Sequence, residues 1–178
     1  MAEQSPDALE RARRVRLMVF DVDGVLTDGR LWYGPQGEEL KVFHSLDGHG
    51  VKMLQEGGVA AALLSGRSSA AVARRAAELG VAHVLQGIAD KRPALDALLA
   101  RLGLEPREAG YMGDDLPDLP VLAHCGFACA PREACAEVLR GAHYVASAPA
   151  GRGAAREVCD YLLRAQGRME SVLARYRA

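Results

Sequence analysis

The chain has 178 residues, a formal net charge of −1, and only 5% aromatic residues among 49% hydrophobic ones. A chain of this length can enclose one core, which must be built from Ala, Val and Leu, as in helices packed on a sheet. With this net charge, the chain has no large basic surface to bind nucleic acid or an anionic membrane. No apolar run reaches the ~20 residues of a membrane span, and the N-terminus does not have the pattern of a secretory signal. We expect one cytoplasmic domain over residues 1–178, with residues 1–14 flexible.

Short apolar runs predict a series of buried strands. The first, VRLMVF, stops at the acidic DVDG, and the second stops at SGRS. A separate pair of runs at 31–33 and 39–43 flanks GPQG and predicts a β-hairpin. The predicted buried strands cover residues 15–20, 59–64, 83–85, 109–112, 126–128 and 143–145.

Helix signals lie between these strands. Asp47 is a candidate cap for the first helix, Ser68 or Ser69 starts the second, and glycines end both. The predicted helices cover residues 48–56, 68–80 and 91–102, and residues 150–178 form a C-terminal tail and helix. Alternation of this kind predicts a three-layer, Rossmann-like α/β fold with a parallel sheet. The intervals after Thr27 and after Ser65 leave room for the hairpin insertion but not for a cap domain.

All four cysteines fall in the last third of the chain, at positions 125, 129, 135 and 159. None forms a CxxC pair, and no histidine near them gives a zinc-like spacing. We expect free and mostly buried thiols.

Polar residues end the predicted strands, at the edge where a parallel sheet binds its ligands. Asp21 and Asp23 are two apart, so they share a face where the chain is extended. Adjacent carboxylates repel each other unless a cation such as Mg²⁺ neutralises them. Asp21 is then a candidate nucleophile towards phosphorus, and Asp23 is a candidate acid and base that also contacts substrate.

The remaining residues of this edge suit phosphate binding and metal binding. Ser65 and Gly66 offer a hydroxyl and an N–H to a phosphate, and Lys91, in the first turn of a helix, bridges nucleophile and phosphate. With Asp21 and Asp23, Asp114 completes the predicted metal site, while Asp115 or Asp118 orients it or binds through water. Each signal alone is weak, since a DxD is often a solvated turn, but the ordered set at one edge predicts phosphoryl transfer.

DVDGVLTDG at 21–29, LLSGR at 63–67, Lys91 and GDDLPD at 113–118 resemble the four motifs of the haloacid dehalogenase-like phosphatases. The resemblance spans about half the chain. It implies a Rossmann-like sheet, Mg²⁺ as cofactor and an aspartyl-phosphate intermediate.

A narrower resemblance covers nearly the whole chain. The hairpin, FHSLDGHGVKML at 43–54 and GRGAAREVCDYLL at 151–163 are similar to a branch of this family that acts on an eight-carbon keto-sugar acid phosphate in lipopolysaccharide precursor synthesis. This resemblance implies a homotetramer. The substrate-contacting positions that it implies are His44, Ser45, Leu46, Asp47, Gly48, Lys52, Arg67, Arg75 and Lys91.

Since no lid fits within the chain, we hypothesise that a neighbouring subunit shields the site through residues 31–43 or 150–156, from which Arg152 and Arg156 reach an anionic substrate. Arg67 can bind the substrate's carboxylate bidentately, although Arg67 and Arg75 can also simply pair with a surface Glu. Alternatives within hydrolases are a phosphatase of a nine-carbon or other sugar acid phosphate. Outside hydrolases, a mutase lacks room for its cap, and a non-catalytic phosphosugar-binding oligomeric module would be expected to lose Asp21 or Asp23.

Overall fold

The computed structural model describes residues 5–37 and 39–177. Over these ranges, one sheet holds six strands in the order β5-β4-β1-β6-β7-β8, and every neighbouring pair is parallel. This architecture confirms the predicted Rossmann-like α/β fold. The strands are β1 (Leu17–Phe20), β4 (Ala60–Leu64), β5 (His83–Leu85), β6 (Ala109–Met112), β7 (Phe127–Ala130) and β8 (Tyr144–Val145).

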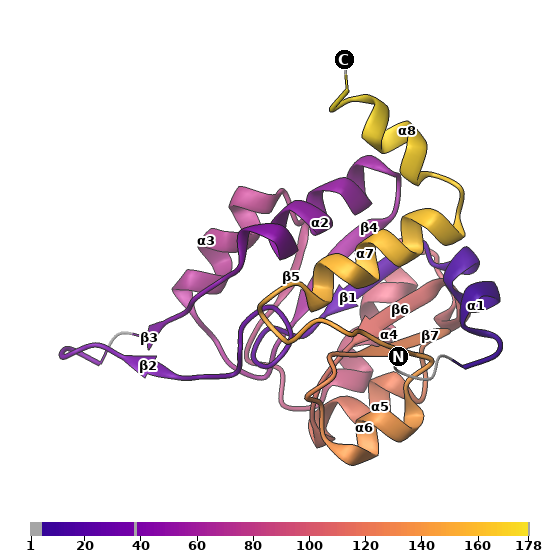
Figure 1. Ribbon diagram of the computed structural model, residues 1–178. Helices are drawn as coiled ribbons and strands as arrows, with labels where there is room; N and C mark the ends of the chain where they lie inside the picture. Colours follow the sequence, from indigo (N-terminus) through magenta and orange to yellow (C-terminus); the bar gives the residue numbers. More distant parts are fainter. Residues whose placement is uncertain (1–4, 38, 178) are drawn as a thin grey trace.

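The sheet is covered on both faces, which explains why its strands read as continuous apolar runs. In β1, Met18 and Phe20 pack into one hydrophobic cluster, while Leu17 and Val19 pack into the other. The first cluster lies under α1 (Ala8–Arg14), α2 (Ser45–Glu56), α3 (Ala70–Leu79), α7 (Ala154–Ala165) and α8 (Met169–Ala174). The second lies under α4 (Lys91–Leu102), α5 (Leu119–Leu122) and α6 (Ala136–Gly141), giving three layers (Figure 1).

A small antiparallel hairpin leaves the body of the domain. It consists of β2 (Trp32–Tyr33) and β3 (Glu39–Leu40) and projects to one side of the sheet (Figure 1). Between β1 and β4 the described residues form only this hairpin, α2 and their loops, and between β4 and β5 they form only α3. No cap domain lies in these described intervals, as predicted.

Within the segment expected to be flexible, residues 8–14 form helix α1. Ala8 and Ala12 are four residues apart, so they share a helix face, and both are buried in the first cluster. Two small buried side chains let the helix pack closely beside α7 and β7. Residues 1–4 lie outside the described residues.

The start of α2 also differs from the prediction that Asp47 caps it. His44 is the cap residue, and its Nδ1 accepts a hydrogen bond of 3.2 Å from the N–H of Leu46. Asp47 lies in the first turn, where its buried carboxylate accepts the N–H groups of Gly153 at 3.1 Å and Arg156 at 2.9 Å. Asp47 therefore caps α7, a helix far along the chain, and joins α2 to it.

All four cysteines are free, and three of them, Cys125, Cys129 and Cys159, are buried, as the sequence predicted. Among the described residues, no helix has both the length and the apolar character required to cross a membrane.

Candidate active site

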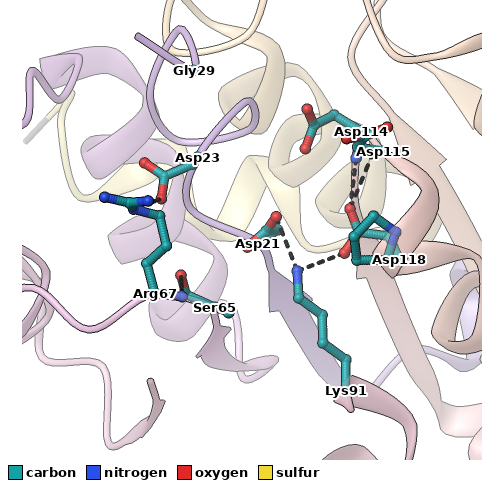
Figure 2. Close-up of a pocket in the computed structure, with 11 residues that line it drawn as sticks. Asp21, Asp23, Gly29, Ser65, Arg67, Lys91, Asp114, Asp115 and Asp118 are labelled. Atoms are coloured by element: carbon teal, nitrogen blue, oxygen red, sulfur yellow. Dashed lines mark hydrogen bonds and ion pairs between the residues drawn. The ribbon is translucent and has the colours of Figure 1, made fainter. Parts of the chain in front are cut away.

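The carboxyl edge of the sheet carries a hollow of about 350 Å³. Asp21 follows β1, Ser65 follows β4, Asp114 follows β6 after one glycine, and Lys91 begins α4. The parallel strands bring these positions to the same edge, so residues far apart in the chain line one site (Figure 2). The lining residues are Asp21, Asp23, Gly29, Ser65, Gly66, Arg67, Lys91, Asp114, Asp115, Pro117 and Asp118.

The floor of this pocket is a buried network of Asp21, Lys91, Tyr111 and Asp118. The Nζ of Lys91 lies 3.0 Å from Asp21 Oδ2 and 2.7 Å from Asp118 Oδ1 (Figure 2). The hydroxyl of Tyr111 donates to Asp118 Oδ1 at 2.6 Å and accepts from Lys91 at 3.3 Å. The other oxygen of Asp118 accepts the N–H groups of Asp114 and Asp115. Asp118 thus ties the lysine to the loop after β6.

Burial is the main cause of the raised carboxylate pKa values in this part of the pocket, and neighbouring charges are the second cause. Burial, and then the neighbouring carboxylate of Asp118, raises the pKa of Asp21 to about 6. Burial and the charge of Asp21 likewise raise the pKa of Asp114 to about 7. Burial lowers the pKa of the Lys91 ammonium, but the nearby carboxylates of Asp21 and Asp118 raise it by more. The pKa of Lys91 is therefore raised overall. Carboxylates outnumber cations in this part of the pocket, since Asp21, Asp114 and Asp118 lie near one ammonium, that of Lys91. The pocket therefore favours binding of a further positive charge.

A group of three carboxylates satisfies the requirements of a hard cation. One oxygen each from Asp21, Asp114 and Asp118 lies within 4.8 Å of the others. Each oxygen of Asp118 already accepts two hydrogen bonds, whereas each oxygen of Asp21 has one partner, which leaves Asp21 and Asp114 as the carboxylates with room for an ion. Oxygen ligands of this kind suit Mg²⁺. The predicted ligand Asp23 lies outside this group, because its carboxylate pairs with Lys41 and faces Arg67.

A glycine permits the tight packing around Asp114. Gly24 has a φ of +85°, and a Cβ at this position would lie 2.0 Å from Oδ2 of Asp114. The DVDG turn therefore presses its main chain against the second candidate metal ligand, which only glycine allows.

Ser65, Gly66 and Arg67 follow β4 and together line the pocket. The hydroxyl of Ser65 is buried and accepts the N–H of Arg67 at 3.2 Å. Arg67 is 42% exposed, and its guanidinium pairs with Glu39 at 2.6 Å and donates to the hydroxyl of Tyr33 at 3.0 Å. Arg75 pairs in a similar way with Glu78 at 3.3 Å. Both arginines thus have the glutamate partner that the sequence left as an alternative, but Arg67 also lines the pocket.

The other residues expected at substrate do not line this pocket. His44, Asp47, Gly48 and Arg75 surround a much smaller hollow beside Phe43. Lys52 borders a surface groove on α2, and Arg152 borders a hollow with Arg30 and Arg132. Ser45 and Leu46 are exposed at the start of α2. The structure therefore separates the predicted substrate contacts into one group inside the pocket and one group outside it.

Three residues of the site were missed by the sequence analysis. Tyr111 lies within a strand that the sequence marked only as apolar, and its hydroxyl gave no separate signal. Glu39 and Lys41 lie in the hairpin, two apart, so their shared strand face was visible in the sequence. Nothing in the sequence placed that face against Asp23 and Arg67, because the hairpin's orientation depends on tertiary packing.

Sheet and pocket together define a class, the hydrolases of the haloacid dehalogenase superfamily. No family model matches the chain. The fold is similar to a solved structure of a putative member of this superfamily from Legionella pneumophila, with a TM-score of 0.93 and 40% identity over 96% of this chain and 94% of that chain.

More specific relatives cover almost the same length. The chain is 44% identical to a 3-deoxy-D-manno-octulosonate 8-phosphate phosphatase from Yersinia pestis, over 92% of this chain and 88% of that protein. It is 39% identical to the enzyme of this name from Moraxella catarrhalis over 96% and 98% of the two chains, with a TM-score of 0.93, and that structure holds a magnesium ion, a phosphate ion and a KDO molecule. The chain belongs to the 3-deoxy-D-manno-octulosonate 8-phosphate phosphatase family.

Proposed function

We propose that the chain is a magnesium-dependent phosphatase that hydrolyses 3-deoxy-D-manno-octulosonate 8-phosphate to the free sugar acid and phosphate. The observation that carries the proposal is the buried Asp21 carboxylate, held 3.0 Å from the Lys91 ammonium on the floor of a pocket with a second acidic group beside it. The relatives of known activity supply the substrate, since their names state it.

In the first step, a carboxylate oxygen of Asp21 attacks phosphorus. The new bond forms between Asp21 and phosphorus while the bond from phosphorus to the sugar oxygen breaks, and Asp23 gives a proton to the leaving alkoxide. In the second step, water attacks the aspartyl phosphate, Asp23 takes the water's proton, and the Asp21 carboxylate is restored. Lys91 and Ser65 offset the charge of the transferring phosphoryl group, which is the main protein contribution to this chemistry.

Asp21 and Asp114 would hold the magnesium ion, with Asp118 orienting the loop that carries Asp114. When bound, the ion keeps Asp21 ionised and neutralises charge on the phosphate. The carboxylate of Asp23 is assigned to proton transfer instead, because Lys41 and Arg67 hold it on the opposite side of the pocket (Figure 2).

The test is phosphate release from a panel of sugar acid phosphates of eight and nine carbons, with Mg²⁺ and with EDTA. We expect the eight-carbon substrate to give the highest kcat/KM, EDTA to stop the reaction, and Asp21→Asn to abolish it. A nine-carbon substrate with a higher kcat/KM would overturn the substrate assignment. Mg²⁺-independent release that survives Asp21→Asn would overturn the mechanism.

We further propose a homotetramer in which a neighbouring subunit completes the substrate site. Two observations support it. The hairpin exposes apolar side chains, including Trp32 at 53% and Val42 at 68%. The expected contacts His44, Lys52 and Arg75 lie outside the pocket of their own chain, so as substrate contacts they must serve another one.

Subunit mixing tests this arrangement. Arg75→Ala and Asp21→Asn subunits, each impaired alone, should regain activity when unfolded and refolded together, because some pockets then receive an intact Asp21 and a neighbour's intact Arg75. Light scattering should give the mass of a tetramer. A monomeric mass, or no gain on mixing, would refute the shared site.

The proposed compartment is the cytoplasm, and the proposed role is the supply of sugar acid for lipopolysaccharide precursors. Four free thiols suit a reducing compartment. Fractionation of a producing Gram-negative cell should place the protein with cytoplasmic markers, and its recovery in the periplasm would contradict the assignment.

A further inference from the structure

The segment 39–42, which begins with β3, presents different chemistry on its two faces. Glu39 and Lys41 are two residues apart and share one face, where their side chains are only 15% and 2% exposed. Leu40 and Val42 point the other way and are 54% and 68% exposed. The hairpin therefore turns a charged face towards the pocket of its own chain and leaves an apolar face free for contact with another subunit.

The charged face completes a ring of ion pairs at the mouth of the pocket, and two of its members, Asp23 and Arg67, line the pocket. Lys41 pairs with Oδ1 of Asp23 and lies 2.7 Å from Oε1 of Glu39. The other oxygen of Glu39 lies 2.6 Å from Nη2 of Arg67, and Nε of Arg67 lies 3.9 Å from Oδ2 of Asp23. We call these four residues the charge ring. Positive and negative groups alternate around it, so every member has two partners of opposite charge.

Burial makes Lys41 the member on which the ring depends. A buried ammonium is unfavourable in free energy unless carboxylates compensate it, and here two do so. In turn, Oε1 of Glu39 lies against the Lys41 ammonium, while Oδ2 of Asp23 is buried without a hydrogen-bond donor among the described residues and faces the guanidinium of Arg67 at 3.9 Å. Without Lys41 these two carboxylates would repel each other across the mouth, and Asp23 would turn away from its position.

Two members of the ring already have assigned roles: Asp23 transfers protons in the proposed function, and Arg67 is predicted from the sequence to bind the substrate's carboxylate. Glu39 and Lys41 have none so far. We infer that Glu39 and Lys41 are positioning residues of the active site: Lys41 orients the carboxylate of Asp23, and Glu39 orients the guanidinium of Arg67. This inference rests on the proposed function. It makes the hairpin part of the catalytic site of its own subunit, beyond its proposed contact with a neighbour.

The two residues should give different kinetic signatures, because they hold groups with different tasks. Lys41→Met should lower kcat about 10- to 100-fold for both the sugar acid phosphate and p-nitrophenyl phosphate, since Asp23 serves the hydrolysis of the same aspartyl phosphate in both cases. KM should change less than about twofold in this variant, and Lys41→Arg should recover part of the loss.

Glu39→Gln should instead raise KM for the sugar acid phosphate about three- to tenfold and leave kcat unchanged, since an unanchored Arg67 must be ordered when the substrate's carboxylate binds. The constants for p-nitrophenyl phosphate, which has no carboxylate, should stay the same. Arg74→Met is the matched control, because Arg74 is an exposed cation whose side chain is 84% accessible and lies on α3 outside the pocket. It should change neither substrate's constants.

Equal losses in all constants for both variants, together with a lower melting temperature, would show that the ring only stabilises the hairpin and would overturn the inference. A lower KM in Glu39→Gln would show that Glu39 competes with substrate for Arg67 and would overturn it as well. Failure of the proposed function looks different, because the unmodified protein would then release no phosphate from the sugar acid phosphate with Mg²⁺.

Discussion

The floor and the mouth of the pocket both pair lysine or arginine with carboxylates, but in different surroundings. On the floor, Lys91 is 5% exposed and Asp118 is 1% exposed. At the mouth, Lys41 is as buried as Lys91, at 2% exposed, but the side chain of Arg67 is 42% exposed. Because an exposed pair is screened by water and a buried pair is not, loss of Lys91 costs far more than loss of Arg67. The floor is therefore suited to the chemistry shared by all substrates, and the exposed Arg67 at the mouth is suited to selection among them.

Removal of Lys91 is the most severe way to test this comparison. In Lys91→Met, Asp21 and Asp118 lose their common cation and the phosphate loses its proposed ammonium partner, so we expect kcat to fall about 10³-fold. Breaking a buried pair should also lower the free energy of unfolding by about 3 kcal/mol. Steady-state kinetics and urea unfolding measure the two effects. Activity within tenfold of the unmodified protein would mean that the floor is not the site of the chemistry.

A substitution at Gly24 tests the geometry of the floor without removing a charge. Gly24→Ala places a Cβ against Oδ2 of Asp114 and forces an unfavourable positive φ, so Asp114 must move. We expect weaker Mg²⁺ binding and a loss of kcat of about 10²-fold. Titration of activity with Mg²⁺ measures both. Gly37→Ala is a suitable control, since Gly37 also has a positive φ but nothing lies within 4 Å of its added Cβ.

At the mouth the expected loss is smaller and selective. Arg67→Ala removes the group predicted to bind the substrate's carboxylate, so kcat/KM for the sugar acid phosphate should fall about 10- to 100-fold. Activity on p-nitrophenyl phosphate should fall much less. Equal losses on both substrates would place Arg67 at the phosphate and would remove the distinction between floor and mouth.

The smallest expected effect is the pH dependence of the metal-free protein. The pKa of Asp21 is raised to about 6 and that of Asp114 to about 7, so between pH 4 and 7 the folded state binds more protons than the unfolded state. Stability in EDTA should therefore increase as the pH falls from 8 towards 5, which calorimetry would detect as a rise in Tm of several degrees. Added Mg²⁺ should raise Tm more at pH 8 than at pH 5, because protons compete for the same carboxylates. A Tm of the metal-free protein that decreases as the pH is lowered from 8 to 5 would contradict the raised pKa values.

Much of the pocket could be predicted before the structure was known. Asp21, Ser65, Lys91 and Asp114 stand next to strand ends or at a helix start, and a parallel sheet brings such positions together whatever the details of packing. For Asp118 the sequence allowed two roles, orienting the metal site or binding the metal through water. The structure favours the orienting role, because both of its carboxylate oxygens already accept hydrogen bonds. Asp47 shows the opposite case. Its residue type is typical of a helix cap, but the sequence assigned it to α2, whereas it caps α7.

Local periodicity, turn glycines and the order of the acidic residues by themselves determined the alternation of strands and helices, the missing cap domain and the phosphoryl-transfer chemistry. The strands and helices depend on contacts between near neighbours in the chain, which a sequence displays directly, and a parallel sheet then brings the polar residues at their ends to one edge. Only the tertiary structure decided that Tyr111 and Asp118 hold Lys91, that Glu39 and Lys41 face Asp23, and that Arg75 lies outside its own pocket. Those contacts join segments whose relative orientation is set by packing against the sheet, and no local pattern encodes it.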